Sequence, residues 1–351
     1  MALVAQRLGG VCALLVLVTA CGAQPDDGTV RVSIMTFNVE NLFDTTDDPS
    51  RRDEAFLPFA DKQTDAHRAL CADITVERWR DECLYADWND VVLQTKLDRI
   101  AAAILQEQSG RGPDIVVLQE VENRAVLERL RREFLAPADY GPAVLLEGQD
   151  TRGIDVAVLS RLPLDGDAIL HAGVFTDYPR GERNDTRGIL QVPLRLANGV
   201  GVTVFAAHFP APFHPAAMRE TAYRHLNELA AAVAPDRLIV AGGDFNTTRA
   251  EIAARDTLDR FVRPTWQRAQ DHGCARCPGT YYYARDDVWN ELDSVFWRTS
   301  AALDVAVVDV RLANQAPQQS TTDGKPRAFR LPAATGVSDH WPLVVELAVT
   351  R

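Results

Sequence analysis

The stretch 238–248, Leu-Ile-Val-Ala-Gly-Gly-Asp-Phe-Asn-Thr-Thr, places the strongest constraint on this chain. Its apolar start, rich in β-branched residues, predicts a buried strand over 238–241, and two glycines then permit a sharp turn or a close approach to a ligand. Asp244 and Asn246 follow two residues apart, so both side chains leave the strand end on the same side. Such a pair suits a phosphoryl centre, where the Asp can activate a water and the Asn can donate to a phosphate oxygen. An Asn/Asp-rich turn without a chemical role is the alternative.

Strands and helices are expected along most of the chain. Apolar residues at helical spacing predict helices at 91–108, 122–135 and 215–233. Alternating or continuous apolar runs predict strands at 30–37, 114–120, 143–147, 154–160, 187–196, 201–207, 291–297 and 303–310, with a last strand after 336. No internal repeat or linker interrupts this pattern. We therefore expect a single domain over 30–349, with 44–90 as an irregular insertion.

The N-terminus has the features of a targeting segment. Arg7 precedes an apolar stretch, 11–20, that is too short to span a membrane comfortably and has the length expected within a signal peptide. The stretch ends in Val18-Thr-Ala-Cys21-Gly, which resembles a bacterial lipoprotein signal with Cys21 as the lipidated residue. We expect a signal peptide over 1–21, a tether over 22–29 and a lipid anchor in the cell envelope. An ordinary cleaved signal is the alternative, and both place the mature chain outside the cytoplasm.

Four further cysteines fit an oxidising compartment. The simplest pairing is two local disulfides, Cys71 with Cys83 and Cys274 with Cys277, although four cysteines allow three connectivities. A zinc site is the alternative, but no His stands at finger-like spacing beside the pairs.

The net charge of −12 argues against a basic surface that grips nucleic acid through many phosphates. It leaves phosphate-ester chemistry open, because bound divalent cations can supply the local positive charge.

Polar residues recur where apolar strands begin or end. Besides Asp244 and Asn246, they are Asn38, Glu120, His208, Asp293, Asp339 and His340. Each one alone is an ordinary turn residue. As a series they indicate many strand ends that converge on one pocket.

The order of these motifs resembles the endonuclease/exonuclease/phosphatase superfamily, whose fold is that of deoxyribonuclease I. The matching stretches are Thr36-Phe-Asn-Val-Glu40, Leu118-Gln-Glu-Val121, Ala207-His208, Gly243-Asp-Phe-Asn246, Leu292-Asp293 and Ser338-Asp-His-Trp-Pro342. The resemblance spans about 30–347. It implies a four-layered α/β sandwich, in which two mixed β-sheets pack face to face between outer helices.

The resemblance also implies a metal side of the site. Glu120 would be the primary ligand of Mg²⁺ or Mn²⁺, since hard cations take carboxylate oxygens. Asn38 would assist at the metal or the phosphate, and Asp339 would be a further metal-side carboxylate. Glu40 would lie behind these ligands. Arg187 would contact the phosphate or substrate, with a structural salt bridge as an equal alternative.

The remaining residues would do the proton chemistry. Asp244 would activate the attacking water and Asn246 would hold a phosphoryl oxygen. His340 would meet the scissile phosphate, with Asp293 fixing its tautomer. His208 would act as the acid toward the leaving oxygen, and Asp155 is a candidate to orient it.

We expect a divalent-metal-dependent phosphodiesterase, monomeric and anchored at the cell surface, that hydrolyses P–O bonds without a covalent intermediate. A nuclease that holds nucleic acid weakly is the first choice. A phospholipase-C/sphingomyelinase-like or inositol-phosphate phosphatase activity is the rival within the superfamily. A catalytically inactive surface binding module is the rival from another class.

Overall fold

The computed structural model describes residues 28–173, 186–298 and 300–351. The predicted signal peptide, Cys21 and nearly all of the predicted tether lie outside these ranges. Among the described residues, no helix combines the length and apolar character needed to cross a bilayer.

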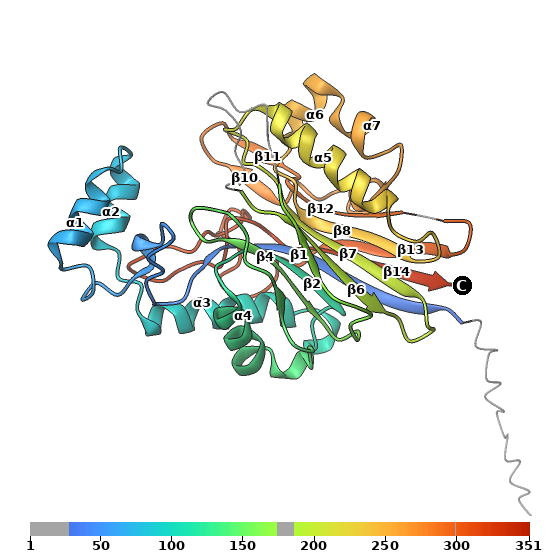
Figure 1. Cartoon of the computed structure of the whole chain (residues 1–351), viewed down its shortest axis with the longest axis horizontal. Coiled ribbons are helices and arrows are strands. Elements are labelled where there is room, and N and C mark those ends of the chain that lie inside the picture. The colour runs from blue at the N-terminus through green and yellow to red at the C-terminus, as the bar shows by residue number, and fades with distance from the viewer. Residues whose placement is uncertain (1–27, 174–185, 299) are drawn as a thin grey trace, which may run out of the picture.

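Two six-stranded mixed sheets form the body of the molecule (Figure 1). The first sheet has the strand order β13-β14-β1-β2-β4-β3, with bounds Asp304–Leu312, Leu343–Thr350, Val30–Leu42, Ile115–Val121, Asp155–Ser160 and Val144–Leu145. The second has the order β5-β6-β7-β8-β12-β9, with bounds Ile169–His171, Ile189–Arg195, Gly201–His208, Leu238–Asp244, Asp293–Arg298 and Gln267–Arg268. A separate hairpin pairs β10 (Tyr281–Tyr283) with β11 (Val288–Asn290).

The two sheets bury their apolar faces against each other. One core cluster contains Ile34 and Val117 of the first sheet together with Val204, Val240 and Val295 of the second. The outer face of each sheet is covered by helices (Figure 1).

A second cluster packs α3 (Asp90–Leu105) and α4 (Arg124–Arg129) on the first sheet. A third packs α5 (Ala216–Ala231) and α7 (Thr257–Phe261) on the second, and α6 (Arg249–Arg255) precedes α7. The layers are therefore helix, sheet, sheet and helix, which confirms the predicted four-layered sandwich.

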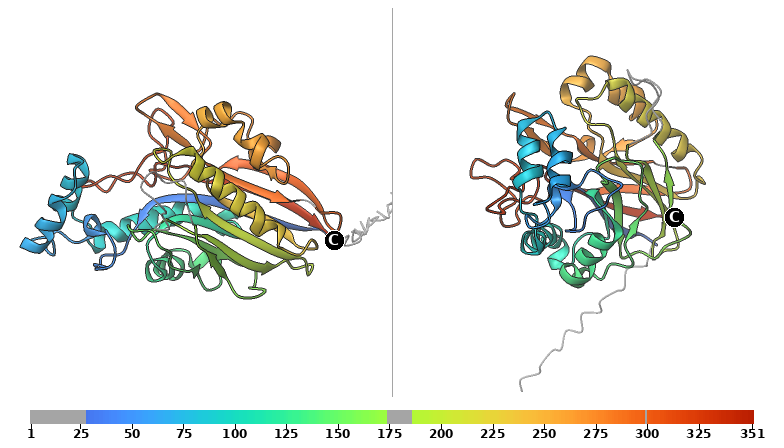
Figure 2. Two further views of the ribbon diagram at one scale, coloured as in Figure 1. Left: turned by 45° about the horizontal axis from the view of Figure 1, so that its top comes forward. Right: turned by 60° about the vertical axis from the view of Figure 1, so that its left-hand side comes forward.

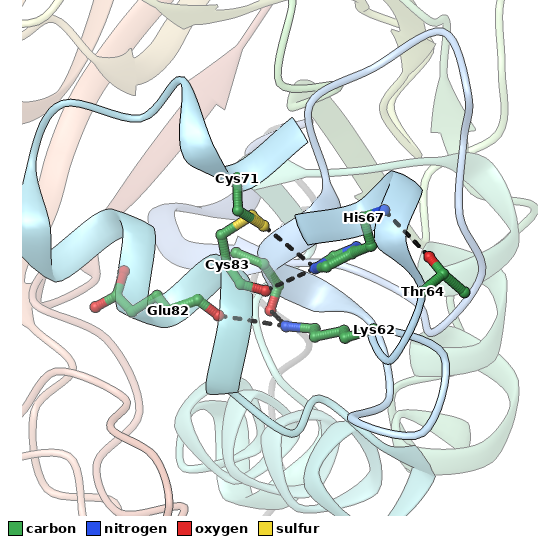
Figure 3. Close-up of a disulfide and its surroundings, with 7 residues drawn as sticks. Lys62, Thr64, His67, Cys71, Glu82 and Cys83 are labelled. Carbon is green, nitrogen blue, oxygen red and sulfur yellow. Dashed lines mark hydrogen bonds between the residues drawn. A yellow bond between two sulfur atoms is a disulfide. The ribbon is translucent and has the colours of Figure 1, made fainter. Parts of the chain in front are cut away.

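The insertion at 44–90 is more regular than its sequence predicts. It contains a short 3₁₀ turn (Glu54–Phe56) and two helices, α1 (Asp65–Ala72) and α2 (Glu77–Tyr85), which project from one end of the sandwich (Figure 2). The predicted disulfide between Cys71 and Cys83 joins the two helices, and His67 Nε2 lies 2.9 Å from the Cys83 carbonyl oxygen (Figure 3). The second predicted disulfide, Cys274–Cys277, is also formed.

Several short elements differ from the sequence-based expectation. The helix expected over 122–135 is α-helical only in α4 and continues as a π-helical turn, Leu130–Phe134. The strands β5 and β9 are two or three residues long, and such lengths carry no periodic signal.

The glycine pair at the centre of the chain does not form a turn. Strand β8 continues through Gly242 and Gly243 to Asp244. A Cβ atom on Gly243 would lie 2.2 Å from the carbonyl oxygen of Ala207 in β7, and one on Gly242 would lie 3.2 Å from Cγ2 of Val117 in the opposite sheet. The glycines therefore allow close packing between strands and between sheets.

We expect Gly243→Ala to destabilise the fold by about 1–3 kcal/mol, the usual cost of an atom forced into a packed core. Gly141→Ala is the matched control, because its Cβ would meet nothing closer than 3.4 Å. Chemical denaturation of both variants measures the difference. Equal free energies of unfolding for the two variants would contradict this expectation, because β7 and β8 would then accommodate the extra methyl group without cost.

Candidate active site

Three polar residues form one row at the ends of three central strands of the second sheet. His208 pairs with Asp244 across the parallel strands β7 and β8, and Asp293 pairs with Asp244 across the antiparallel strands β8 and β12. Parallel strands end at the same edge of a sheet, and β12 begins where β8 ends. The register therefore brings a histidine and two carboxylates to the same edge, where all three are buried.

The first sheet presents Asn38 and Glu120 at the corresponding edge. The ladder between β1 and β2 shifts register between Asn38 and Leu42, and the ladder between β2 and β4 shifts between Gln119 and Val121. Such bulges change the direction in which the side chains beside them point, here those of Asn38 and Glu120.

Left-handed backbone conformations also occur at four residues in or next to these strand ends. Glu40, Asn41, Glu120 and Asn246 all have positive φ, between 52° and 64°. Residues other than glycine adopt this conformation at a cost, and they do so often where a functional site requires it.

Asn38 joins the two sheets at the site. Its Nδ2 donates to Glu120 Oε1 over 3.3 Å and to Asp244 Oδ2 over 3.1 Å. Its Oδ1 accepts from the backbone N–H of Glu40 over 3.0 Å, so the amide orientation is determined by its partners. Glu120 Oε2 accepts from the N–H of Asn41, which fixes the carboxylate from the other side.

His340 and Asp293 form a buried carboxylate–imidazole pair. His340 Nδ1 lies 2.7 Å from Asp293 Oδ2. Burial alone would lower the pKa of His340, but the charge and hydrogen bond of Asp293 outweigh it and hold this pKa well above its usual value. The imidazole is therefore charged at neutral pH, and its Nε2 lies 3.9 Å from Asp244 Oδ2.

His208 has the opposite electrostatic character. Burial, followed by the charges of Arg187 and Arg152, holds the pKa of its imidazole well below the usual value. Its Nε2 lies 3.6 Å from Asp244 Oδ2 and 3.9 Å from Glu120 Oε1. Two imidazoles thus face the same Asp244 oxygen, one neutral and one charged.

Asp244 itself is poised for proton transfer. Burial, and then the neighbouring Asp293 charge, raise the pKa of Asp244 to about 7. A carboxylate with a pKa near the working pH is suited to act as a general base.

Further carboxylates extend the site toward the loop before β14. Glu40 Oε2 accepts from the backbone N–H groups of Phe329 and Asp339, and Arg330 pairs with Glu40. Partial burial, and then the Glu40 charge, raise the pKa of Asp339 to about 7, although its side chain is 37% exposed. Ser338 Oγ donates to the Asn38 carbonyl over 2.7 Å and accepts from the N–H of His340, so this loop is tied to β1.

Three of the predicted residues have protein partners of their own, and for Arg187 this is the salt bridge expected as its alternative role. Asn246 Nδ2 donates to the Phe209 carbonyl over 3.0 Å. Arg187 donates to Asp150 Oδ2 over 3.0 Å and to the same Phe209 carbonyl. Asp155 accepts from the N–H of Gly148 and lies in a separate acidic pocket with Glu122.

Asp155 therefore does not reach His208 as expected for its orienting residue. The Nδ1 atom of His208 has no hydrogen-bond partner in the part of the chain that the structure describes.

The model of the endonuclease/exonuclease/phosphatase family matches residues 35–340. The chain belongs to this family. Enzymes of the endonuclease/exonuclease/phosphatase family hydrolyse phosphate esters and depend on divalent metal ions, and the matched range includes every strand-end residue of the site.

Solved structures share the fold at low sequence identity. An endonuclease/exonuclease/phosphatase family protein from Bacteroides thetaiotaomicron is 14% identical, with a TM-score of 0.54 over 91% of this chain and 98% of that one. A second, from Bacteroides vulgatus, is 17% identical, with a TM-score of 0.53 over 91% and 98% of the two chains. TDP2 of D. rerio, humanized by 14 mutations, is 14% identical, with a TM-score of 0.53 over 90% and 98%. No curated protein matches the chain.

The side chains at this edge fit a hard divalent cation. Glu120, Asp339 and Asp244 supply carboxylate oxygens, the ligands that Mg²⁺ and Mn²⁺ prefer. Within the described ranges, Glu120 forms no ion pair with Lys or Arg, and its imidazole neighbour His208 is neutral. Among these residues, Glu120 therefore has no directly paired cationic side chain, which favours the binding of a divalent cation beside it.

Sequence reasoning missed one buried charge under the site. Lys96 of α3 is fully buried, donates from Nζ to the Val337 carbonyl over 2.7 Å and lies over the ring of Phe329. Burial lowers its pKa to about 8. Its position was a usable signal, because residue 96 falls on the same helical face as the apolar residues Leu93, Leu97 and Ile100.

We expect Asp293→Asn to lower the pKa of His340, because the amide cannot stabilise the imidazolium. His340 has a raised pKa in the folded state, so its pairing stabilises the fold fully below an unfolded pKa of about 6.5. That contribution is lost as pH rises through the folded pKa. The variant should therefore lose most stability at low pH, by about 1.4 kcal/mol for each unit of pKa lost.

NMR titration of His340 and denaturation over a pH series in EDTA measure the two effects. An unchanged His340 titration in Asp293→Asn would contradict the assigned pair. Asp304→Asn, at an exposed residue of β13, is the control for removing a carboxylate elsewhere.

Proposed function

We propose that this chain is a Mg²⁺- or Mn²⁺-dependent phosphodiesterase that cleaves nucleic acid internally at the cell surface. The observation that carries the proposal is the pair of imidazoles around Asp244, with His208 Nε2 at 3.6 Å and His340 Nε2 at 3.9 Å from one carboxylate oxygen. A phosphate between them meets an imidazole on either side, which suits transfer of a proton to the leaving oxygen as well as stabilisation of the phosphoryl group.

The reaction is an in-line attack of water on phosphorus. Asp244 takes the proton of the water, the new P–O bond forms and the bond to the leaving oxygen breaks. The His340 imidazolium stabilises the charge of the pentavalent transition state. His208 gives its proton to the leaving oxygen, and the arriving phosphate anion favours the protonated form that this step needs.

Glu120 and Asp339 would hold the divalent cation, with Asn38 fixing the carboxylate of Glu120. A bound cation supplies charge neutralisation and Lewis-acid polarisation of the phosphate oxygens.

The direction of β1 supports a substrate outside the anchoring membrane. Strand β1 starts at Val30, next to the proposed tether, and reaches the site at Asn38. At a rise of about 3.3 Å per residue, the site lies roughly 26 Å from Val30. A lipid on Cys21 would therefore be joined, through the tether, to the end of the sandwich opposite the catalytic edge, which favours a soluble polymer over the lipids of the same membrane.

We expect mature protein to nick supercoiled plasmid with Mg²⁺ or Mn²⁺ and not with EDTA. Asp244→Asn and His340→Ala should each lower the rate by at least about 10²-fold, because general base catalysis and charge stabilisation are each worth that much. His272→Ala, at an exposed histidine hydrogen-bonded to Gln267, is the matched control and should nick at the unaltered rate.

Parallel incubations with sphingomyelin and inositol phosphates separate the substrate classes. Release of phosphocholine or phosphate without nicking would replace the nuclease with one of its rivals in the family. Inactivity on all substrates, with Mg²⁺ binding equal in wild type and Glu120→Gln, would favour a binding module without the assigned metal site.

The net charge of −12 predicts weak DNA binding with a shallow salt dependence. Few phosphates should be neutralised by Lys or Arg, so few counterions are released on binding. The slope of log K against log salt measures the number of counterions released. Asp244→Asn is used for this measurement because it should bind DNA without cleaving it. A steep slope would reveal a basic face that the total charge conceals.

A further inference from the structure

A cavity of about 240 Å³ lies directly beside the catalytic edge. Its walls are the residues around the start of β6, the residues that follow β7, and one side of α5. His208 separates the cavity from the catalytic carboxylates, because its Nε2 faces Asp244 and Glu120 while the residue also lines the cavity.

Residues that line the cavity carry polar atoms that lack partners. Six buried side-chain atoms have no hydrogen-bond partner in the described part of the chain, and three of them belong to residues of this one cavity: Arg187 Nε, His208 Nδ1 and His225 Nε2. The side chains of Arg187 and His208 are only 9% and 4% exposed. An unpartnered buried polar group is costly, so three in one place indicate that a ligand completes them.

These unpartnered atoms share one chemistry. Each is a nitrogen, of the Arg187 guanidinium or of an imidazole, that can donate a hydrogen bond. Arg187 is held in place by Asp150 and the Phe209 carbonyl, which leaves Nε for another partner. Arg224 adds a second guanidinium to the lining, and Glu228 is the single carboxylate among the described residues that form it. Two guanidinium groups, together with imidazole nitrogens that can donate hydrogen bonds, fit an oxyanion.

We propose that this cavity binds a phosphate group, and that during turnover the group is a phosphate of the substrate strand next to the scissile one. The second part rests on the proposed nuclease function. A phosphate oxygen there accepts from Arg187 Nε, His225 Nε2 and His208 Nδ1. The phosphate thereby orients the His208 ring, which Asp155 does not contact, and His208 acts correctly only when a polymeric substrate fills the cavity.

Direct binding tests the cavity independently of catalysis. Full mature protein carrying Asp244→Asn is titrated with inorganic phosphate in EDTA by calorimetry. We expect saturable binding that His225→Phe weakens at least tenfold, the scale of one hydrogen bond to a charged group, and that Arg187→Gln weakens further. His272→Phe, at an exposed histidine outside the cavity, should bind as the parent does.

Absence of saturable binding, or equal binding in the His225→Phe and His272→Phe proteins, overturns the proposal. His225 is only partly buried, so His225→Phe keeps the test interpretable if Arg187→Gln fails to fold. Phosphate binding without any nicking by the wild type would refute the proposed function and leave the cavity assignment standing. Nicking without phosphate binding would support the proposed function and refute the cavity assignment.

Kinetics then identify the source of the phosphate. In the enzyme with Asp244 intact, His225→Phe should lower kcat/KM severalfold more for an oligonucleotide than for bis(p-nitrophenyl) phosphate, which has no neighbouring phosphate. An equal loss on both substrates overturns occupancy by the strand. Activation of bis(p-nitrophenyl) phosphate hydrolysis by inorganic phosphate, absent in His225→Phe, would instead identify free phosphate as the occupant.

Discussion

The amide of Asn38 is the contact on which the site depends, because it crosses from one sheet to the other. Its Nδ2 donates to Glu120 beside it in the first sheet and to Asp244 at the edge of the second. Such a short side chain can reach both carboxylates only if the sheets pack closely, and Gly242 against Val117 allows that approach. The glycines that precede Asp244 thus serve the site through packing, and their effect on backbone turning is secondary.

The sequence predicts the layers of the fold well, for physical reasons visible in particular elements. The expected strand at 201–207 and helix at 215–233 match β7 and α5 within about two residues, because long apolar periodicity reflects burial on a packed face. Strands β5 and β9 are too short to carry such a pattern. The path of β8 through two glycines was not predictable either, since local preference favours a turn and only contacts with Ala207 and Val117 require a strand.

Site residues divide in the same way. Those at strand ends could be predicted, because each is a polar residue directly beside an apolar run. The register of β7, β8 and β12 then brings His208, Asp244 and Asp293 into one row. Their hydrogen-bond partners could not. Asp155 stands at the start of β4, yet the bulge in β2 and the bond from Gly148 place its carboxylate in another pocket. Whether two side chains meet is decided by bulges and loop contacts that leave no periodic trace in the sequence.

The charges of the site explain why its two histidines differ. Carboxylates gather around His340, so the charges of Asp293, Asp339 and Asp244 all favour its imidazolium. His208 lies toward Arg187 and Arg152, whose charges add to burial and favour the neutral ring. Under the proposed function, a phosphate that approaches from the side of the arginines would favour the protonated form of His208. The lowered pKa of His208 in the protein without ligand would then make its proposed role as proton donor depend on the bound substrate.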